Sequence, residues 1–588
     1  MAALLLMAIA GCKLSNQNPQ GENNKELAAL FEKYYEENLQ LFPLNATAIG
    51  DTRYNDLLPV DFTDSYRSKL HDFFSKYASY LDVFDRSTLN QNDQISYDIF
   101  KREMEINIEG LHFHDNYIPF NQFYALPLEL GQFGSGQGVQ PFKTVKDYDD
   151  WIKRAAAFSA WTDSAIVYFK KGLAVNYVLP KALVEKMIPE MNALVADTAS
   201  KSLFYGPVNT FPATFFTESD KKRLTDAFVQ LINQQISPSY KKLGVFFQNE
   251  YLPKARTTSG ISSLPLDSAL YPYLVRLLTT THKTPEEIYQ TGLQEVARIR
   301  GLMDSVKNAT GFTGNLAAFF EYMKTAPQFT PYKTPKEVLD AFEKIHQTMQ
   351  PNLSKMFIHV PKTAFEIRQT EAFRAASASA EYNQGSPDGT RPGIFYVPIL
   401  DATKFNTTSG MESLFLHEAI PGHHYQVSLQ QEDTLLPKFR RFGGNNAYVE
   451  GWALYCESLG KELGLYTDPY QYMGTLGDEI HRAIRLVVDV AIHTKNMSRE
   501  EAIKYMMDNE AISEQGATAE IERYMAIPGQ ALGYKIGALK IRELRTKYEQ
   551  KYGARFKLSD FHDEVLKDGA MPLDVLERKL DTWALTIK

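Results

Sequence analysis

The sequence predicts a mainly α-helical fold divided into two lobes, with little β-structure. Three segments carry a capping residue followed three positions later by a glutamate, which is the signature of a helix start: Thr284-Pro285-Glu286-Glu287, Thr334-Pro335-Lys336-Glu337 and Ser498-Arg499-Glu500-Glu501. The chain has 588 residues, of which 44% are hydrophobic, so it can fill a large core. We expect an N-terminal helical lobe over residues 25–270 and a catalytic helical lobe over residues 271–588.

The first 24 residues predict a lipoprotein signal and a tether. Ala3 to Ala10 form an apolar run too short to span a bilayer, and Ile9-Ala10-Gly11-Cys12 resembles the lipobox of bacterial lipoproteins. Residues 1–12 are then the signal peptide, Cys12 is the acylated first residue of the mature chain, and the polar residues 13–24 form the tether. Because no Lys or Arg precedes the apolar run, the alternatives are a start upstream of Met1 and an unstructured, mildly apolar N-terminus.

The net charge and the two cysteines limit which binding partners and which disulfides the chain can have. The net charge of -8 argues against nucleic acid or an anionic membrane surface as the main partner. The lipobox predicts a cell-envelope protein, facing the periplasm or on the outer membrane, that touches the membrane only through a lipid anchor on Cys12. The second cysteine, Cys456, would then have no partner for an intrachain disulfide.

The secondary-structure signals follow in order along the chain. The folded part begins with a helix over residues 25–40, which has apolar residues at helical spacing. The three capping signatures predict helices near 285–304, 335–349 and 499–509. A turn-rich segment at 383–393 leads into Ile394 to Ile399, a strand expected beside the active-site helix. Pro398 cannot donate to a sheet, so it marks a sheet edge or a strand end.

The segment His417-Glu418-Ala419-Ile420-Pro421-Gly422-His423-His424 predicts a metal site. Two imidazoles and a distant carboxylate supply the three ligands of a catalytic zinc, whose fourth position is left for water. A glutamate next to the first histidine is the usual general base, here Glu418. Manganese and cobalt also accept these ligand types.

The spacing of these histidines leaves the second ligand open. Ligating histidines normally lie four residues apart on one helix face, but the fourth residue after His417 is Pro421. On an ideal helix His424 would face the same way as His417. Pro421 and Gly422 disturb the helix, and a bulge there would bring His423 to the metal instead. We prefer His423, with His424 as the alternative. A helix whose histidines merely lie in the core or at an interface is the non-functional interpretation.

A second acidic motif, Tyr448 to Glu457, supplies the distant carboxylate. Glu450 is the better third ligand. Glu457 lies seven residues later on the same helix face, where it either orients a ligating histidine or is an ordinary solvated glutamate. Trp452 is expected in the core.

The helix expected over residues 478–494 carries a polar stripe on an apolar background. His481, Arg485, Asp489 and His493 recur every four residues, and such groups must be hydrogen-bonded when buried. The stripe favours a structural ladder of ion pairs. The alternative is a cleft wall in which Arg482 or Arg485 binds a substrate carboxylate through two hydrogen bonds.

Taken together, these motifs resemble the bacterial domain-of-unknown-function family 885, whose members are often lipoproteins. The likeness covers nearly the whole chain after the tether and rests on the segments 385–397, 417–426, 449–457 and 528–537. That family in turn resembles the thimet-oligopeptidase-like helical metallopeptidases. The resemblance implies a large bilobed helical fold of this kind, with a small β-sheet beside the active-site helix.

The same resemblance implies roles for individual residues. His417 and His423 match the two metal-binding histidines, with two extra residues between them that leave the second ligand in doubt. Glu418 matches the general base, and Glu450 matches the carboxylate ligand. Gly533-Tyr534 resembles the glycine-tyrosine stretch over the scissile bond, where Tyr534 would donate a hydrogen bond to the tetrahedral intermediate. A packed core ring is the other interpretation of Tyr534.

These observations predict a zinc-dependent hydrolase, with Zn²⁺ as cofactor and short peptides as substrates. A zinc amidohydrolase or esterase acting on a non-peptide substrate would have the same metal chemistry. A non-catalytic binding lipoprotein is a further alternative, although a pure binding site has no need of the base Glu418.

Overall fold

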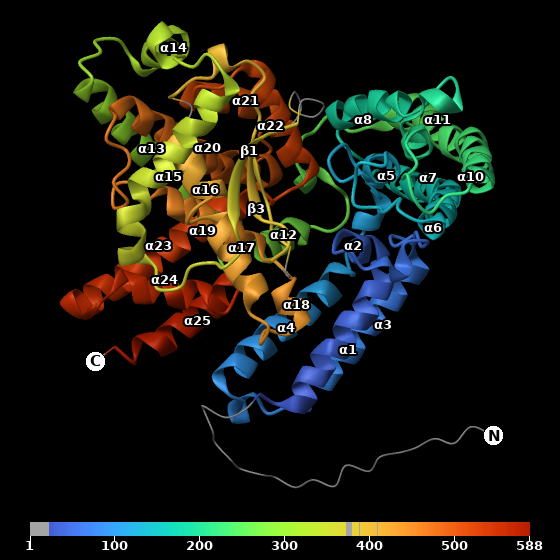
Figure 1. Ribbon diagram of the computed structural model, residues 1–588, viewed down its shortest axis with the longest axis horizontal. Helices are drawn as coiled ribbons and strands as arrows, with labels where there is room; N and C mark the ends of the chain where they lie inside the picture. The colour runs from blue at the N-terminus through green and yellow to red at the C-terminus, as the bar shows by residue number, and fades with distance from the viewer. Residues whose placement is uncertain (1–22, 372–374, 376–378, 387–388, 409, 588) are drawn as a thin grey trace.

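Helices make up most of the chain in the computed structural model, and the predicted mainly α-helical fold is confirmed (Figure 1). The structure describes residues 23–371, 375, 379–386, 389–408 and 410–587. Cys12, the predicted signal peptide and residues 13–22 of the predicted tether therefore lie outside the described residues. Within the described part of the chain, no helix is both long and apolar enough to cross a bilayer.

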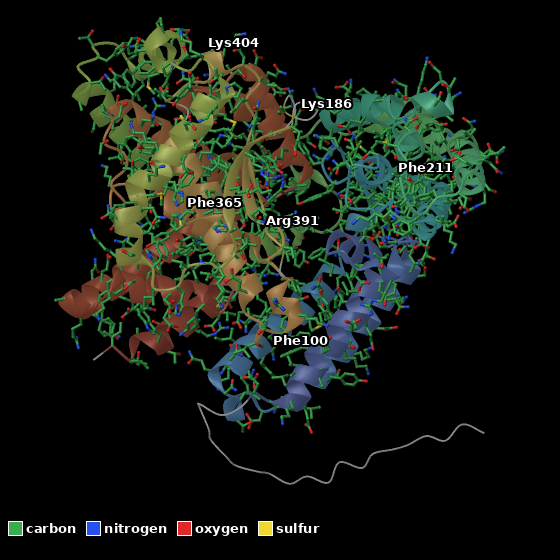
Figure 2. The ribbon with its side chains drawn as sticks, in the orientation of Figure 1. Phe100, Lys186, Phe211, Phe365, Arg391 and Lys404 are labelled. Carbon is green, nitrogen blue, oxygen red and sulfur yellow. The ribbon has the colours of Figure 1, made fainter. Side chains whose placement is uncertain are left out.

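The N-terminal helices lie together at one edge of the molecule (Figure 1). They are α1 (Lys25–Leu41), α2 (Pro43–Ala48), α3 (Asp64–Leu81) and α4 (Gln91–Gly110). Asn24 caps α1, because its side chain accepts hydrogen bonds from the first backbone N–H groups of the helix. Phe100 of α4, labelled in Figure 2, packs against Phe31 of α1 and against Phe439. Because Phe439 belongs to α18 (Lys438–Arg441), these helices are tied to the C-terminal half of the chain.

Helices α5–α11 form a separate group beside them (Figure 1). They are α5 (Leu126–Gly134), α6 (Val145–Ala156), α7 (Phe158–Ala174), α8 (Lys181–Ala193), α9 (Gly206–Asn209), α10 (Glu218–Leu231) and α11 (Ser237–Phe246). One hydrophobic cluster joins Trp151 and Phe169 of this group to Ile484 and Met525 of the C-terminal half. Apolar packing therefore crosses residue 270, and the lobe boundary expected there stays a prediction.

The remaining helices form the part of the molecule that carries a small sheet (Figure 1). They are α12 (Leu270–Thr279), α13 (Pro285–Ala309), α14 (Leu316–Thr325), α15 (Pro335–Met356), α16 (Met411–Glu418), α17 (His423–Glu432), α19 (Asn446–Glu457), α20 (Pro469–Thr494), α21 (Arg499–Asn509), α22 (Glu514–Ala526), α23 (Leu532–Tyr552), α24 (Leu558–Leu566) and α25 (Leu573–Ala584). The three capping signatures each begin a helix as predicted, namely α13, α15 and α21. Cys456, at the end of α19, is buried and free.

The sheet has three strands in the order β1-β3-β2, formed by β1 (Phe365–Gln369), β2 (Glu381–Asn383) and β3 (Gly393–Val397). β1 pairs with β3 in parallel, with Phe365 opposite Gly393, and β2 pairs with β3 in the antiparallel direction, with Glu381 opposite Tyr396. β3 is the strand predicted from residue 394 onward. It ends at Val397, directly before Pro398, so the proline marks a strand end and not a sheet edge.

α16 and α20 run side by side in the same direction. A Cβ atom on Gly474 of α20 would lie 2.3 Å from the carbonyl oxygen of Thr408, just before α16. One turn further along both helices, Ser413 Oγ donates a hydrogen bond to Asp478 Oδ2 at 2.7 Å. The residue numbers in contact increase together along the two helices, so the helices are parallel. One turn beyond Ser413 and Asp478, residues 417 and 418 therefore lie level with residue 482.

α19 and α23 approach each other even more closely. A Cβ atom on Gly451 would lie 2.6 Å from the Cα atom of Gly537, and one on Gly537 would lie 1.9 Å from the carbonyl oxygen of Ala447. Only glycine at both positions allows this backbone contact. The contact places Glu450 of α19 and Tyr534 of α23 on adjoining segments.

Candidate metal centre

The histidine-glutamate motif lies where α16 ends and α17 begins. α16 ends at Glu418 and α17 begins at His423, with a non-helical turn over residues 419–422. The single bulged helix expected here is therefore wrong. Two contacts stabilise the turn: Trp452 Nε1 donates to the carbonyl oxygen of Pro421 at 2.9 Å, and the His424 backbone N–H donates to the carbonyl oxygen of Ala419 at 3.1 Å. Trp452 is fully buried, as expected of a core residue.

Gly422 is required by the tightness of this turn. A Cβ atom there would lie 1.9 Å from the carbonyl oxygen of His417 and 2.4 Å from that of Leu416. Both obstacles are backbone atoms, so the turn itself would have to move. We expect Gly422→Ala to lower the free energy of unfolding by about 1–3 kcal/mol and to weaken zinc binding at least ~10-fold, as when a supporting contact of a site is lost.

Denaturant unfolding and zinc titration would measure both effects. Gly444→Ala is the matched control, because a Cβ atom on Gly444 would meet no atom within 4 Å. Equal stability and equal zinc affinity of the two variants would show that the turn tolerates a side chain. The geometry of the turn would then not determine metal binding.

Three side chains from three helices meet at this turn. His417 Nε2 lies 3.4 Å from Glu450 Oε2, and His423 Nε2 lies 3.7 Å from the same oxygen. One donor atom of each residue lies within 4.8 Å of the other two, and this is the group with metal-ligand geometry within the described residues. Ligand atoms of a tetrahedral zinc, at roughly 2.0–2.1 Å from the metal, lie roughly 3.3 Å apart. The two separations from Glu450 are close to this value, so the group could hold a metal ion.

His417 is held between two carboxylates. Its Nδ1 lies 2.8 Å from Glu457 Oε1, which is the contact expected if Glu457 orients a ligating histidine. Burial opposes the charged imidazolium, but the hydrogen bonds to Glu450 and Glu457 outweigh burial and raise the pKa of His417. The hydrogen bond with His417 lowers the pKa of Glu450 against the effect of burial. With Nδ1 occupied by Glu457, Nε2 is the nitrogen that points to the candidate site.

The side chains of His423 and Glu450 are the more solvent-exposed members of the group of three. Burial and the neighbouring charge of His417 lower the pKa of His423 to about 4, so its imidazole is neutral, the form that binds metals. The side chain of Glu450 keeps 21% of its surface exposed and that of His423 keeps 13%, against 6% for His417. A ligand can therefore reach the centre from the side of Glu450.

Glu418 lies beside the centre and is oriented by the sheet. Its Oε2 accepts a hydrogen bond from the backbone N–H of Tyr382, on β2, at 3.0 Å. Burial raises the pKa of Glu418 to about 7. Tyr382 was not found from the sequence, because β2 is only three residues long and its pairing with β3 is a long-range contact.

His424 points away from the group. Its Nδ1 lies 3.0 Å from the hydroxyl of Tyr382, and its ring packs against Phe365 of β1. Burial lowers its pKa to about 4. It is therefore a buried neutral histidine in contact with the sheet, outside the group formed by the other two histidines of the motif.

Tyr534 lies in the first turn of α23 and is partly buried. The guanidinium of Arg485 lies over its ring, 5.0 Å from the centroid. Burial, together with the negative charge of Glu450, raises the pKa of Tyr534, so the phenol keeps its proton and can donate a hydrogen bond. Tyr534 thus lies near Glu450, and its ring also packs against a hydrophobic core cluster.

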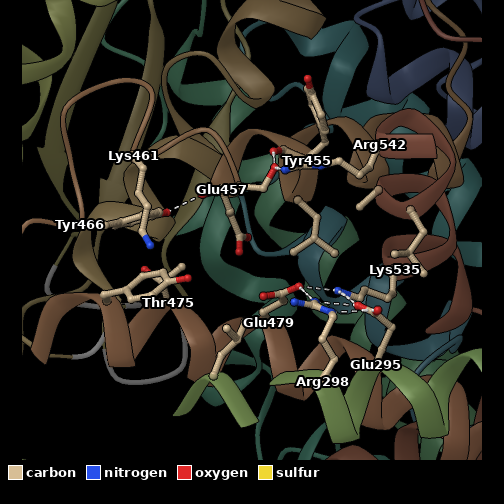
Figure 3. A pocket seen from close by; sticks show the side chains of 16 residues that line it. Glu295, Arg298, Tyr455, Glu457, Lys461, Tyr466, Thr475, Glu479, Lys535 and Arg542 are labelled. Carbon is tan, nitrogen blue, oxygen red and sulfur yellow. Dashed lines mark hydrogen bonds and ion pairs between the residues drawn. The ribbon is translucent and has the colours of Figure 1, made fainter. Parts of the chain in front are cut away.

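Glu457 also lines a cavity of about 390 Å³ (Figure 3). Its carboxylate projects into this space, and Oε2 has no hydrogen-bond partner among the described residues. Across the cavity, Lys535 forms ion pairs with Glu295 and Glu479. A cavity of this size has room for water molecules. Glu457 thus connects His417 to a polar interior space.

Comparison with known proteins places the chain in a family. The model of the family described as "Bacterial protein of unknown function (DUF885)" matches residues 43–580. The chain belongs to this family. The resemblance expected from the sequence motifs is thereby confirmed. No curated protein matches this DUF885 chain.

Solved structures support the fold of this DUF885 protein. A proposed lipoprotein from Colwellia psychrerythraea is 28% identical with a TM-score of 0.86, over 95% of this chain and 99% of that one. A proposed lipoprotein of unknown function from Shewanella oneidensis is 19% identical with a TM-score of 0.73, over 94% of this chain and 99% of that one. A carboxypeptidase from Pyrococcus furiosus aligns with a TM-score of only 0.38, which is too low to indicate a shared fold.

The polar stripe of α20 is hydrogen-bonded along its length in this DUF885 protein. His481 contacts Glu510, Arg485 contacts Glu520, and His493 accepts from the backbone N–H of Ile261. These contacts agree with the structural ladder favoured by the sequence. Arg482 lies outside this ladder.

Asp489 is the buried carboxyl of the stripe. It accepts hydrogen bonds from the Tyr271 hydroxyl at 2.6 Å and from the Gly529 backbone N–H at 3.0 Å, and burial outweighs them to raise its pKa to about 7. An unfolded chain releases this proton near pH 3.9. Between about pH 4 and pH 7 the folded state therefore binds a proton that the unfolded state has lost, so the free energy of unfolding falls as the pH rises through this window.

We expect Asp489→Asn to remove this part of the pH dependence, because the amide keeps an oxygen acceptor but does not titrate. Urea unfolding at several pH values between 4.5 and 7.5, with chelator present throughout, would measure it. The variant should gain stability relative to the unmodified protein as the pH rises. If the free energies of unfolding of the two proteins changed equally with pH, Asp489 would be charged in the folded state across this range.

Proposed function

We propose that this protein is a zinc-dependent hydrolase, and specifically a metallopeptidase that cleaves short peptides. The observation that carries the proposal is the meeting of His417, His423 and Glu450 beside the carboxylate of Glu418. Two imidazole donors and one carboxylate, with an accessible side, form the ligand set of a catalytic zinc. A glutamate next to a ligand histidine is the feature that separates a hydrolytic site from a site that only binds metal.

Each residue has a task in this mechanism. A zinc ion held by His417, His423 and Glu450 would act as a Lewis acid that acidifies water and polarises a carbonyl group. Glu418 accepts the proton of the attacking water and passes it to the nitrogen of the departing amine. A pKa of about 7 suits both steps, since the carboxyl can then hold or release a proton near neutral pH. Tyr534 donates a hydrogen bond to the negative oxygen that develops on the substrate carbonyl.

We place this activity at the cell envelope. The lipobox ending at Cys12 supports an anchored lipoprotein, and both similar structures described above are named as proposed lipoproteins. Peptide turnover outside the cytoplasm fits such a location.

Digestion of a defined peptide mixture would test the proposal. The purified protein, supplied with one equivalent of zinc, should cleave peptides of three to ten residues, as followed by mass spectrometry. A chelator should abolish cleavage and added zinc should restore it. Hydrolysis of acyl amides or esters with no cleavage of any peptide would contradict the peptidase assignment and favour the amidohydrolase or esterase alternative.

A further inference from the structure

Arg482 is the charged residue of α20 that lies level with the His417-Glu418 pair of α16. α16 and α20 run in the same direction, and the hydrogen bond from Ser413 to Asp478 fixes their alignment. One turn beyond each of these residues come His417 on α16 and Arg482 on α20. Arg482 therefore lies level with the His417-Glu418 pair, on a neighbouring helix.

The electrostatics agree with this position. The positive charge of Arg482 is one of the influences that lower the pKa of Glu418 and of Glu450, acting against burial at both carboxyls. The guanidinium is thus close to the proposed base and to a proposed metal ligand at the same time.

One edge of this guanidinium has no partner. Nη1 donates to the carbonyl oxygen of Asp478 at 3.2 Å and lies 3.5 Å from the Asp478 carboxylate. Nε is buried and has no hydrogen-bond partner. The contacts with Asp478 both use Nη1, so neither involves Nη2. The two neighbouring arginines differ, because Arg485 and Arg523 are both paired with Glu520. Arg482 alone of these three keeps a free edge.

That free edge matches a carboxylate. Nε and Nη2 of an arginine present two parallel N–H groups, which bind the two oxygens of a planar carboxylate at once. A single developing oxyanion would use only one of them. The Arg482 side chain is 22% exposed, so a carboxylate can approach Nη2, beside which the buried Nε is the second donor.

We propose that Arg482 binds the C-terminal carboxylate of the substrate, so that the enzyme acts on peptides with a free C-terminus and cuts near that end. This inference rests on the proposed function for the identity of the ligand as a peptide. It adds the end of the peptide that is recognised and the residue that recognises it.

Binding measurements without turnover test this proposal. The zinc-loaded Glu418→Gln protein would be titrated calorimetrically with two matched pools of N-acetylated tripeptides, one with C-terminal acids and the other with C-terminal amides. We expect the acid pool to bind at least ~10-fold more tightly, which corresponds to about 1.4 kcal/mol. Adding Arg482→Gln should remove this preference, and Arg482→Lys should restore part of it, since lysine keeps the charge but lacks the two-pronged geometry.

Several outcomes would overturn the proposal. They are equal binding of the two pools with Arg482 intact, binding of neither pool, and an acid preference that survives Arg482→Gln. The control is Arg578→Gln on α25, an exposed arginine whose side chain pairs with Asp574 and Asp98 and which should leave the preference unchanged. Because the test needs no hydrolysis, a protein that prefers acids but cleaves no peptide would contradict the proposed function and leave the Arg482 site standing.

Discussion

Replacing Glu418 by glutamine should leave zinc bound and reduce peptide hydrolysis about 10²–10⁴-fold, the usual contribution of a general base. Glutamine has nearly the same shape as glutamate, and its side-chain oxygen can still accept the hydrogen bond from the Tyr382 backbone N–H. What the substitution removes is the ability to take a proton from water. Zinc content by elemental analysis and kcat/KM on a cleaved peptide would measure the two effects separately.

Glu412→Gln is the matched control for this experiment. Glu412 lies on the same helix as Glu418, and its carboxylate also accepts a hydrogen bond from a backbone N–H group, that of Tyr466 at 2.9 Å. Burial raises its pKa as well. The control should keep both zinc and activity. Full activity in the Glu418 variant would refute the mechanism, and inactivity of the unmodified protein on every substrate would favour the non-catalytic binding lipoprotein.

His423→Ala and His424→Ala should differ sharply in zinc affinity. His423 lies 3.7 Å from Glu450 and belongs to the group of three, whereas His424 contacts Tyr382 and Phe365. We expect the His423 variant to bind zinc more than ~100-fold more weakly, since loss of an outer partner alone costs 10–100-fold. The His424 variant should keep one zinc per chain and lose some stability, because a buried ring is removed.

Competition with a chromophoric chelator would measure both affinities. Loss of zinc only in the His424 variant would show that His424 is the ligand. The turn between α16 and α17 would then have to differ from the one described. Equal loss in both variants, with reduced thermal stability, would point to a shared folding defect. A double variant with Glu450→Gln would then separate ligand loss from unfolding.

Local signals in the sequence predicted the helical architecture well. The capping residues Thr284, Thr334 and Ser498 each begin a helix, because a cap and its glutamate partner lie within one turn and need no distant contact. The residue types of the candidate centre were also recognisable, since few patterns other than metal binding explain so many histidines beside a glutamate. The preference for His423 over His424 rested on the disturbance that Pro421 and Gly422 introduce.

The local pattern could not show how the turn after Glu418 is built. The turn depends on Trp452, thirty-one positions beyond Pro421, and on the contact of Gly422 with backbone oxygens of α16. The orientation of Glu418 by Tyr382 likewise joins two distant segments. The alignment that puts Arg482 beside the motif follows from the packing of α16 on α20. All of these are tertiary contacts, which periodicity and capping do not report.

The glycine contact between α19 and α23 has a mechanical consequence. Where two backbones touch, no side chain lies between them that could change rotamer and let the helices slide or part. Glu450 directly precedes Gly451, and Tyr534 lies one turn before Gly537, so the carboxylate and the phenol are carried by a single stiff unit. Movement around a substrate then falls to segments outside this unit, such as the three-residue edge strand β2 that orients Glu418. Binding of a substrate would then leave the spacing of the carboxylate and the phenol unchanged.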